Sequence, residues 1–177
     1  MSRQKWFGTN LKPLLDLLAS KDGSVRINAR ESLISLGKPA VSSLSKALTK
    51  SSSNQVRWEA AKALGAIRSP RSIPSLVKAL DDRDRDVAWL AAEALKEFGK
   101  VAWPTLFNAL IKDGAKSALF RQGAHHVLCN QKEAGFEDLL PSLLKDLEAN
   151  GLRESAMVTA REINKRIRKM QSWRGRP

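Results

Sequence analysis

The feature that most constrains the fold of this chain is a pattern of apolar residues that returns at a fixed interval. Val25, Val56 and Val87 are 31 residues apart, and each is followed by an alanine four positions later and a leucine eight positions later. A looser fourth copy begins at Phe120. Residues at these three offsets lie within about 80° of one another around a helix. Each copy therefore predicts an amphipathic helix, and self-similarity over about 20 to 50 residues predicts a stacked repeat array.

A second apolar series completes each copy and predicts a second helix. Its members form three columns of equivalent positions, which start at Val41, Leu44 and Leu48. The later members are Ile73, Trp103 and Leu140, then Leu76, Leu106 and Leu143, then Leu80, Leu110 and Leu147. Two apolar stripes make a helical hairpin that can bury its apolar surface only against its neighbours.

The predicted fold is all-α, an α-solenoid of about four helical hairpins with capping helices at both ends. Gly37 and Gly99 are predicted to end first helices, because glycine readily adopts the left-handed conformation that is common there. Pro39 and Pro104 are predicted to open second helices. The predicted boundaries are 9–20 for the N-terminal cap, 24–50, 54–81, 84–112 and 114–149 for the repeats, 152–170 for the C-terminal helix and 171–177 for a basic tail.

The composition sets limits on the class of protein. The 177 residues suit a single domain. No apolar run approaches the roughly 20 residues that a membrane span needs, and the first residues lack a secretory apolar core. The one cysteine, Cys129, has no second cysteine with which to form an internal disulfide. These features lead us to expect a soluble protein of the cytoplasm.

The net charge of +13 is unevenly distributed along the chain. It is +6 in residues 1–50, +2 in 51–100, −1 in 101–150 and +6 in 151–177. Such a field favours an acidic partner, which can be a nucleic acid, an anionic protein surface or a lipid headgroup. It also favours solubility, so the charge leaves these alternatives open.

The second repeat, VRWEAAKALGAIRSPRSIPSLVKALDD, resembles the HEAT-repeat superfamily, and in particular its short phycobilisome-lyase-type class. The resemblance rests on the Val-Arg, Ala-Ala and Leu-Gly pairs and covers roughly residues 20–150. In HEAT proteins the arginine after the first apolar position pairs with an aspartate of the preceding turn. Here that arginine recurs as Arg26, Arg57 and Arg121. Asp22 and Asp113 are candidate partners, whereas the serines before Arg57 offer it none.

The resemblance implies three kinds of function. One is a scaffold that binds another protein along the curved inner face of the solenoid. The second is a HEAT-like alkylpurine DNA glycosylase, which grips DNA in a basic concavity, and the third is a bilin lyase. The iron-dependent hydroxylase branch of the family is excluded, because it takes its metal ligands from repeated His-Glu pairs. This chain has only His125-His126, and no glutamate follows either histidine.

The resemblance also suggests a column of polar residues on the concave side, which second helices line in HEAT proteins. This column lies two positions before the last leucine of each second helix and consists of Lys46, Lys78, Asn108 and Lys145. Spaced lysines on a curved surface suit a phosphate backbone or an acidic peptide. The alternative is an ordinary solvated helix face.

Two tryptophans occupy one equivalent position in adjacent repeats. Trp58 and Trp89 each lie two residues after the opening apolar residue, at about 200° around the helix and nearly opposite the core stripe. Large aromatic side chains in solvent often mark contact sites. The alternative is that they cover a neighbouring helix.

The C-terminal segment combines cations with an aromatic residue. Its candidate nucleic-acid-binding residues are Lys165, Arg166, Arg168, Lys169, Trp173 and Arg174. Basic residues around an aromatic ring suit single-stranded nucleic acid, since bases stack on such rings. The alternative is a solvated end of the chain.

Nothing in the sequence indicates a catalytic or cofactor site. His125 and Cys129 are one helical turn apart, but no third metal ligand is evident nearby. Asp82, Asp84 and Asp86 alternate with arginines and are typical of a loop and a helix cap. We therefore predict a non-catalytic binding protein without a cofactor, whose partner is a protein with an acidic surface. The alternative is a nucleic-acid-binding protein.

Overall fold

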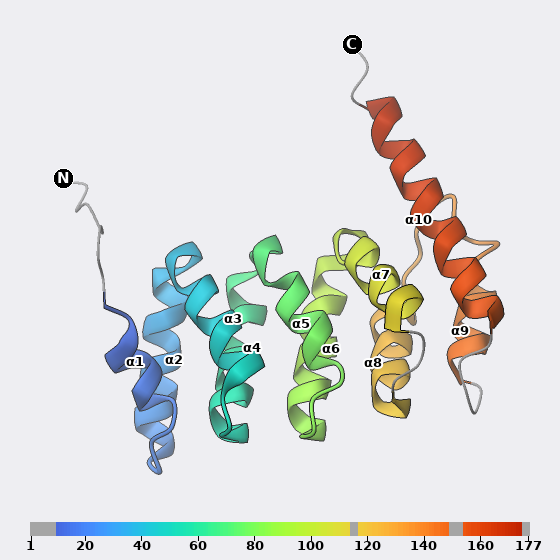
Figure 1. Ribbon diagram of the computed structural model, residues 1–177. Coiled ribbons are helices and arrows are strands. Elements are labelled where there is room, and N and C mark those ends of the chain that lie inside the picture. Colours follow the sequence, from blue (N-terminus) through green and yellow to red (C-terminus); the bar gives the residue numbers. More distant parts are fainter. Residues whose placement is uncertain (1–9, 114–116, 149–153, 175–177) are drawn as a thin grey trace.

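The computed structural model describes residues 10–113, 117–148 and 154–174, and these residues form ten α-helices and three short 3₁₀ turns without any strand (Figure 1). The helices follow one another as four helical hairpins along the array (Figure 1). Their order along the array follows their order in the sequence. The predicted all-α solenoid is therefore confirmed.

Each hairpin consists of a longer first helix and a second helix. The first helices are α2 (Gly23–Leu36), α4 (Asn54–Ile67), α6 (Arg85–Phe98) and α8 (Ala118–Leu128). The second helices are α3 (Val41–Lys50), α5 (Ile73–Ala79), α7 (Trp103–Asp113) and α9 (Leu140–Glu148). The 3₁₀ turns precede α3, α5 and α7 and span Lys38–Ala40, Pro70–Ser72 and Gly99–Val101. Pro39, which we predicted to open a second helix, lies in the first of these turns, whereas Pro104 lies in the first turn of α7.

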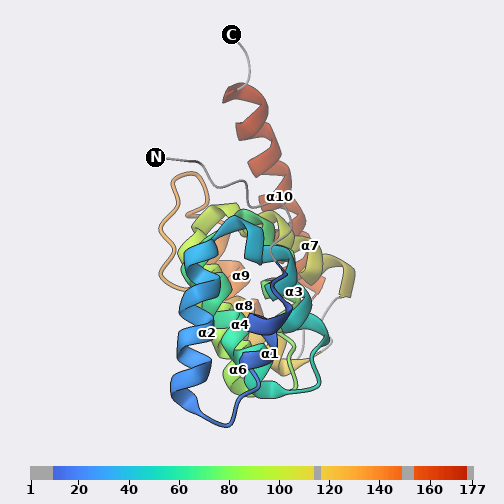
Figure 2. The ribbon, with the colours of Figure 1, turned by 90° about the vertical axis from the view of Figure 1, so that its left-hand side faces the viewer.

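The helices form two layers, which the end-on view of Figure 2 separates, with α2 on one side and α3 on the other. In the first-helix layer, α4 packs against both α2 and α6, and α6 packs against α8. In the second-helix layer, α5 packs against both α3 and α7. Figure 1 views the molecule from the side of the second-helix layer. The outer sides of the two layers consequently face in opposite directions.

The core lies between the two layers and contains the periodic residues of the sequence. Every member of the three second-helix columns is buried, from Val41 to Leu147. The alanines and leucines of the first helices are buried as well, as Ala60 and Leu64 illustrate. Val87 is fully buried, whereas Val25 is only half-buried, because α2 packs against a single other first helix, α4. Burial of one such leucine contributes about 1.5–3 kcal/mol.

The ends of the first helices follow local rules. Side chains of Asp22, Ser53, Asp84 and Ser117 cap the N-termini of α2, α4, α6 and α8. At the C-termini of α2 and α6, Gly37 and Gly99 have φ angles of 67° and 52°. Arg68 has the same positive φ, 52°, after α4. The sequence did not reveal this last position, because a non-glycine residue rarely adopts that conformation.

Two further helices lie at the ends of the array. The N-terminal helix, α1 (Lys12–Leu17), is shorter than the predicted 9–20 and packs against α2 and α3. The last helix, α10 (Glu154–Arg174), packs against α7 and α9 of the second-helix layer and continues beyond the other helices (Figure 1). Its buried side chains are Ala156, Ala160, Ile163, Asn164 and Ile167. The predicted helix start at residue 9, the start of repeat four at 114–116 and the tail at 175–177 lie outside the described residues.

In the described part of the chain, no helix combines the length and the apolar character that crossing a bilayer requires.

Candidate binding surfaces

The two tryptophans lie at equivalent places on the outer side of the first-helix layer. Trp58 on α4 is packed partly against the hydrophobic core, whereas Trp89 on α6 is largely exposed. Trp89 is 55% exposed, and Ile27, its counterpart on α2, is 48% exposed. Trp58 is half-buried. We call this outer side of α2, α4, α6 and α8 the first-helix face.

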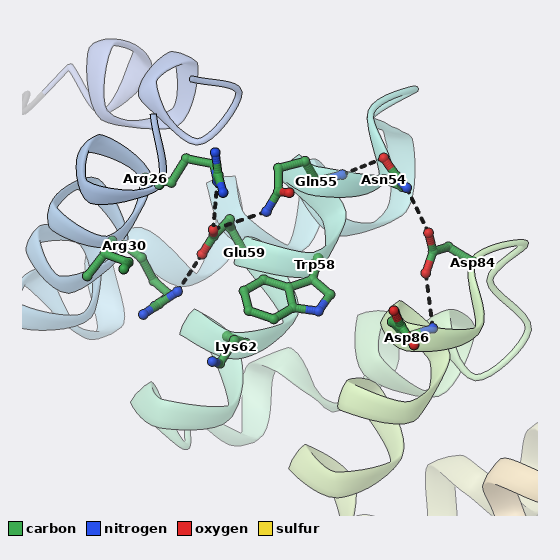
Figure 3. Close-up of a pocket in the computed structure, with 11 residues that line it drawn as sticks. Arg26, Arg30, Asn54, Gln55, Trp58, Glu59, Lys62, Asp84 and Asp86 are labelled. Atoms are coloured by element: carbon green, nitrogen blue, oxygen red, sulfur yellow. Dashed lines mark hydrogen bonds and ion pairs between the residues drawn. The ribbon is translucent and has the colours of Figure 1, made fainter. Parts of the chain in front are cut away.

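Trp58 stands beside a hollow of about 420 Å³ between α2 and α4 (Figure 3). Residues at the start of α6 complete its rim. The ammonium of Lys62 lies 4.5 Å from the centre of the Trp58 ring, in a cation–π contact. The polar residues of the hollow are Arg26, Arg30, Asn54, Gln55, Glu59, Lys62, Asp84 and Asp86.

Glu59 is a buried carboxylate at the floor of this hollow, with a side chain only 3% exposed. One carboxylate oxygen accepts hydrogen bonds from Arg26 Nε at 3.3 Å and Gln55 Nε2 at 3.2 Å. The other accepts from Arg30 Nη1 at 2.6 Å. Two arginines of the first repeat thereby hold the second repeat (Figure 3). The sequence alone did not indicate this site, because its signal is no more than an acid about one period after two arginines.

Carboxylates also fix the N-terminus of α6 at the edge of the hollow. Asp84 accepts a hydrogen bond from Asn54 Nδ2 at 2.8 Å and from the backbone N–H groups of Asp86 and Val87 at 3.0 and 3.3 Å. The hydrogen bond from Asn54 is the main reason that the pKa of Asp84 lies below its usual value. Among the alternating aspartates, Asp84 therefore caps α6, as the sequence indicated.

Arg57 joins the second repeat to the third. It binds Asp82 with two hydrogen bonds, of 2.8 and 2.9 Å, and Nη1 donates to the carbonyls of Ser51 and Ser52. The sequence alone indicated no partner for Arg57, because Asp82 lies after the next helix and not in the turn before the arginine. Arg26 is likewise paired with Glu59, and its candidate partner Asp22 caps α2 instead. The candidate partner of Arg121, Asp113, has a side chain outside the described part of the structure.

Trp89 lies against the next repeat. Its ring is 4.2 Å from the ring of His126 on α8, centre to centre, and His126 Nε2 also contacts the carboxylate of Glu93. A second hollow, of about 300 Å³, lies between α6 and α8 beside Trp89. Its lining includes Arg85, Leu119 and Gln122. One face of Trp89 thus covers a neighbour, while more than half of the side chain stays exposed.

The lysine column lies on the other layer. Lys46 on α3, Lys78 on α5 and Lys145 on α9 are exposed. The fourth member, Asn108 on α7, accepts a hydrogen bond from Asn164 Nδ2 of α10 at 3.0 Å. The column and the two tryptophans therefore face opposite sides of the stack, and no single flat surface can contact both.

The candidate residues of the C-terminal helix differ in their surroundings. Lys165, Arg168 and Lys169 are exposed. Arg166 instead binds Asp138 through two hydrogen bonds, of 2.7 and 3.0 Å. These hydrogen bonds are the main reason that the pKa of Asp138 lies below its usual value. The side chains of the two other candidates, Trp173 and Arg174, lie outside the described part of the structure.

His, Cys, Asp and Glu side chains do not gather in groups of three that could hold a metal ion, as far as the described residues go. Cys129 donates its S–H to the carbonyl of His126. His125 Nε2 lies 3.0 Å from the carboxylate of Glu148 on α9. The contact of His125 ties α8 to α9, whereas the hydrogen bond of Cys129 is local to the end of α8.

The comparison with protein families agrees with the geometry. A family model described as HEAT repeats matches residues 11–100, which is just over half of the chain. No curated protein matches the chain. The narrower assignment to the phycobilisome-lyase-type class stays a prediction. The match covers α1 to α6, α8 continues the first-helix layer, and α7 and α10 continue the second, so this chain belongs to the HEAT-repeat family.

Proposed function

We propose that this protein is a non-catalytic scaffold that holds a protein partner on its first-helix face. HEAT repeats commonly serve as protein-interaction scaffolds and are generally non-catalytic. The observation that carries the proposal is the pair Trp58 and Trp89, at equivalent positions of adjacent repeats and each beside a hollow. Tryptophan is enriched at the energetic centres of protein interfaces, where its large ring fills a pocket of the partner or lines one.

The charges on the first-helix face indicate the kind of partner. Cations and carboxylates alternate around the two hollows, with Arg85 close to Asp86 and Lys62 close to Glu59 in sequence and in the lining. We therefore expect the partner to present apolar side chains that are surrounded by both positive and negative charges.

The carboxylates beside Trp58 support binding rather than catalysis. An acid catalyst needs a carboxyl group that can exchange a proton with the substrate. Both oxygens of Glu59 accept hydrogen bonds from neighbouring side chains, and Asp84 caps α6. These groups hold the helices in place, so the hollow is built as a rigid contact surface.

The test is affinity capture from native cells with the whole chain as bait, quantified by mass spectrometry. The variant Trp58→Ala with Trp89→Ala removes both rings. The matched control, Val101→Ala with Val158→Ala, removes two apolar side chains that are 61% and 55% exposed elsewhere. We expect the tryptophan variant to lose a protein that the wild type and the control retain, with melting temperatures close to that of the wild type.

Two results would argue against the proposal. One is equal capture by all three proteins. The other is a large drop in melting temperature for the tryptophan variant with capture intact, since that would make the two rings structural cover.

A further inference from the structure

Carboxylates are almost absent from one long part of the chain. Residues 32–80 contain eight lysines and arginines but a single acid, Glu59. That acid is buried in the first-helix layer and paired with Arg26 and Arg30. Helices α3 and α5 and the 3₁₀ turns before them contain no acid. The outer sides of α3 and α5 therefore carry cations and no acid of their own, and the nearest carboxylates are Asp81 and Asp82 after α5, which line one hollow with Lys50 and Lys78.

The lysines of this region are arranged by the repeat. Lys46 and Lys78 occupy the same position on adjacent second helices, opposite the buried stripe. Lys50 lies one turn after Lys46 on the same side of α3. None of the three forms an ion pair with another described residue, and all three are exposed. Adjacent helices lie about 8–10 Å apart, so these charges form a short row across the array.

Helix α10 extends the cationic surface over repeats three and four. It lies on α7 and α9, so its outward side faces the same way as Lys46 and Lys78 (Figures 1 and 2). Arg161, Lys165 and Arg168 follow one another at helical spacing on that outward side and are exposed. Among the ion pairs of the described residues, one includes a member of this group, Lys165 at 4.0 Å from Glu162, and such an exposed pair contributes little.

The neutral residues of this surface distinguish between kinds of anionic partner. Besides the lysines, the outward positions of α3 and α5 carry Ser42, Ser43, Thr49 and Pro74, without an exposed aromatic or large apolar side chain in either helix. Protein interfaces have an apolar or aromatic centre, and single strands stack their bases on aromatic rings. Neither feature is present here. Lysines and hydroxyl groups are instead the side chains that contact the phosphates of a duplex.

We propose that Lys46, Lys50 and Lys78, together with Arg161, Lys165 and Arg168 of α10, bind a nucleic-acid duplex through its phosphates. The expected binding is independent of base sequence, because contacts to phosphates carry no sequence information directly. It is also independent of the tryptophan contact, because the two surfaces face opposite sides of the stack. A protein partner and a duplex can then bind the same molecule together.

The test measures binding of the whole chain to a random-sequence DNA duplex as salt rises from about 50 to 200 mM. Each phosphate contact contributes about 0.9 to the slope of log affinity against log salt. Lys46→Gln with Lys78→Gln removes two contacts, so we expect the slope to fall by about 1.8 and the affinity to fall at least about tenfold. The matched control, Lys62→Gln with Arg85→Gln, removes two cations from the first-helix face and should bind almost as the wild type does.

Four outcomes would overturn the proposal. The first is the absence of duplex binding at the lowest salt concentration, and the second is an equal loss in both double variants, which would reflect net charge alone. The third is a preference for a single strand of the same length. The fourth is binding of polyglutamate at this surface without binding of the duplex, which would assign the surface to an acidic protein. If the Trp58→Ala, Trp89→Ala variant binds the duplex as the wild type does, duplex binding does not depend on the scaffold function.

Discussion

A buried arginine, the fourth residue of α4, connects three parts of the array. Arg57 is 4% exposed and uses its planar group of donors to bind Asp82 and the carbonyls of Ser51 and Ser52. The guanidinium thereby donates to backbone carbonyls in the turn before its own helix and to a carboxylate in the turn after the next helix. Arg26 makes the same contacts to backbone carbonyls one repeat earlier. Lysine could not replace either, because it lacks the fork of fixed donors.

We expect Arg57→Met to lower the free energy of unfolding by about 3–5 kcal/mol, because it leaves the carboxylate of Asp82 without its partner. Urea unfolding followed by circular dichroism measures this change. The control is Arg68→Met, which removes an exposed ion pair with Glu97 and should cost at most about 1 kcal/mol. Adding Asp82→Leu to Arg57→Met should restore much of the loss. A cost of under about 1 kcal/mol for Arg57→Met would show that the pair is not structural.

At the scale of the helices, the N-terminus of α6 shows how neighbouring repeats are kept in register. Asp84 caps α6 and at the same time accepts a hydrogen bond from Asn54, the first residue of α4. One hydrogen bond therefore joins the N-termini of two adjacent first helices, α4 and α6. The lowered pKa of Asp84 means that its ionised form is preferred in the folded state.

We expect Asp84→Ala to lower the free energy of unfolding by about 0.5–2 kcal/mol near neutral pH, through loss of the cap. Because the folded-state pKa is lowered, this stability is present above the unfolded pKa of about 3.9 and is lost as the pH falls through the folded value. The difference between wild type and variant should therefore shrink in acid, as urea unfolding near pH 7 and pH 3 would measure. Asp86→Ala, in the same turn, is the control. A difference that does not change with pH would contradict the assignment.

The helices themselves could be predicted because their cause is local and repeated. An apolar residue every three or four positions defines a helix, and the return of that pattern after 31 residues defines the stack. The end of α4 at Arg68 could not be predicted, because its left-handed conformation leaves no mark in the sequence. Packing of the hairpin imposes it.

The candidate surfaces could be predicted only in part. Helical geometry alone indicates that Trp58 and Trp89 point away from the core stripe. The charged partners of Arg57 and Glu59 could not be inferred, because they lie 25 to 33 residues away and only stacking brings them together. The position of α10 on the second-helix layer, where it contacts Asn108, is another result of packing that no short pattern encodes.

At the scale of the whole molecule, stability is distributed along the array because each repeat contacts mainly its neighbours. The last helix is an exception, since α10 bridges the second helices of two repeats, α7 and α9. Ile163 lies in this contact and is fully buried. Helix α10 therefore holds the C-terminal half of the array together.

We expect Ile163→Ala to cost about 2–5 kcal/mol, because it leaves a cavity between α10 and the second-helix layer. Hydrogen exchange measured by mass spectrometry should show the loss of protection in α7, α9 and α10, while α2 and α4 keep most of theirs. Val158→Ala removes an exposed side chain of the same helix and is the control. A uniform loss of protection along the chain would contradict the bridging role of α10.

The stacking of Trp89 on His126 has a practical consequence for experiments on this molecule. The emission of an indole depends on what lies against its ring, and these two rings are 4.2 Å apart. The emission of Trp89 should therefore report any displacement of the His126 ring. With the remaining tryptophans replaced by phenylalanine, the chain would carry its own optical probe at the junction of its third and fourth repeats.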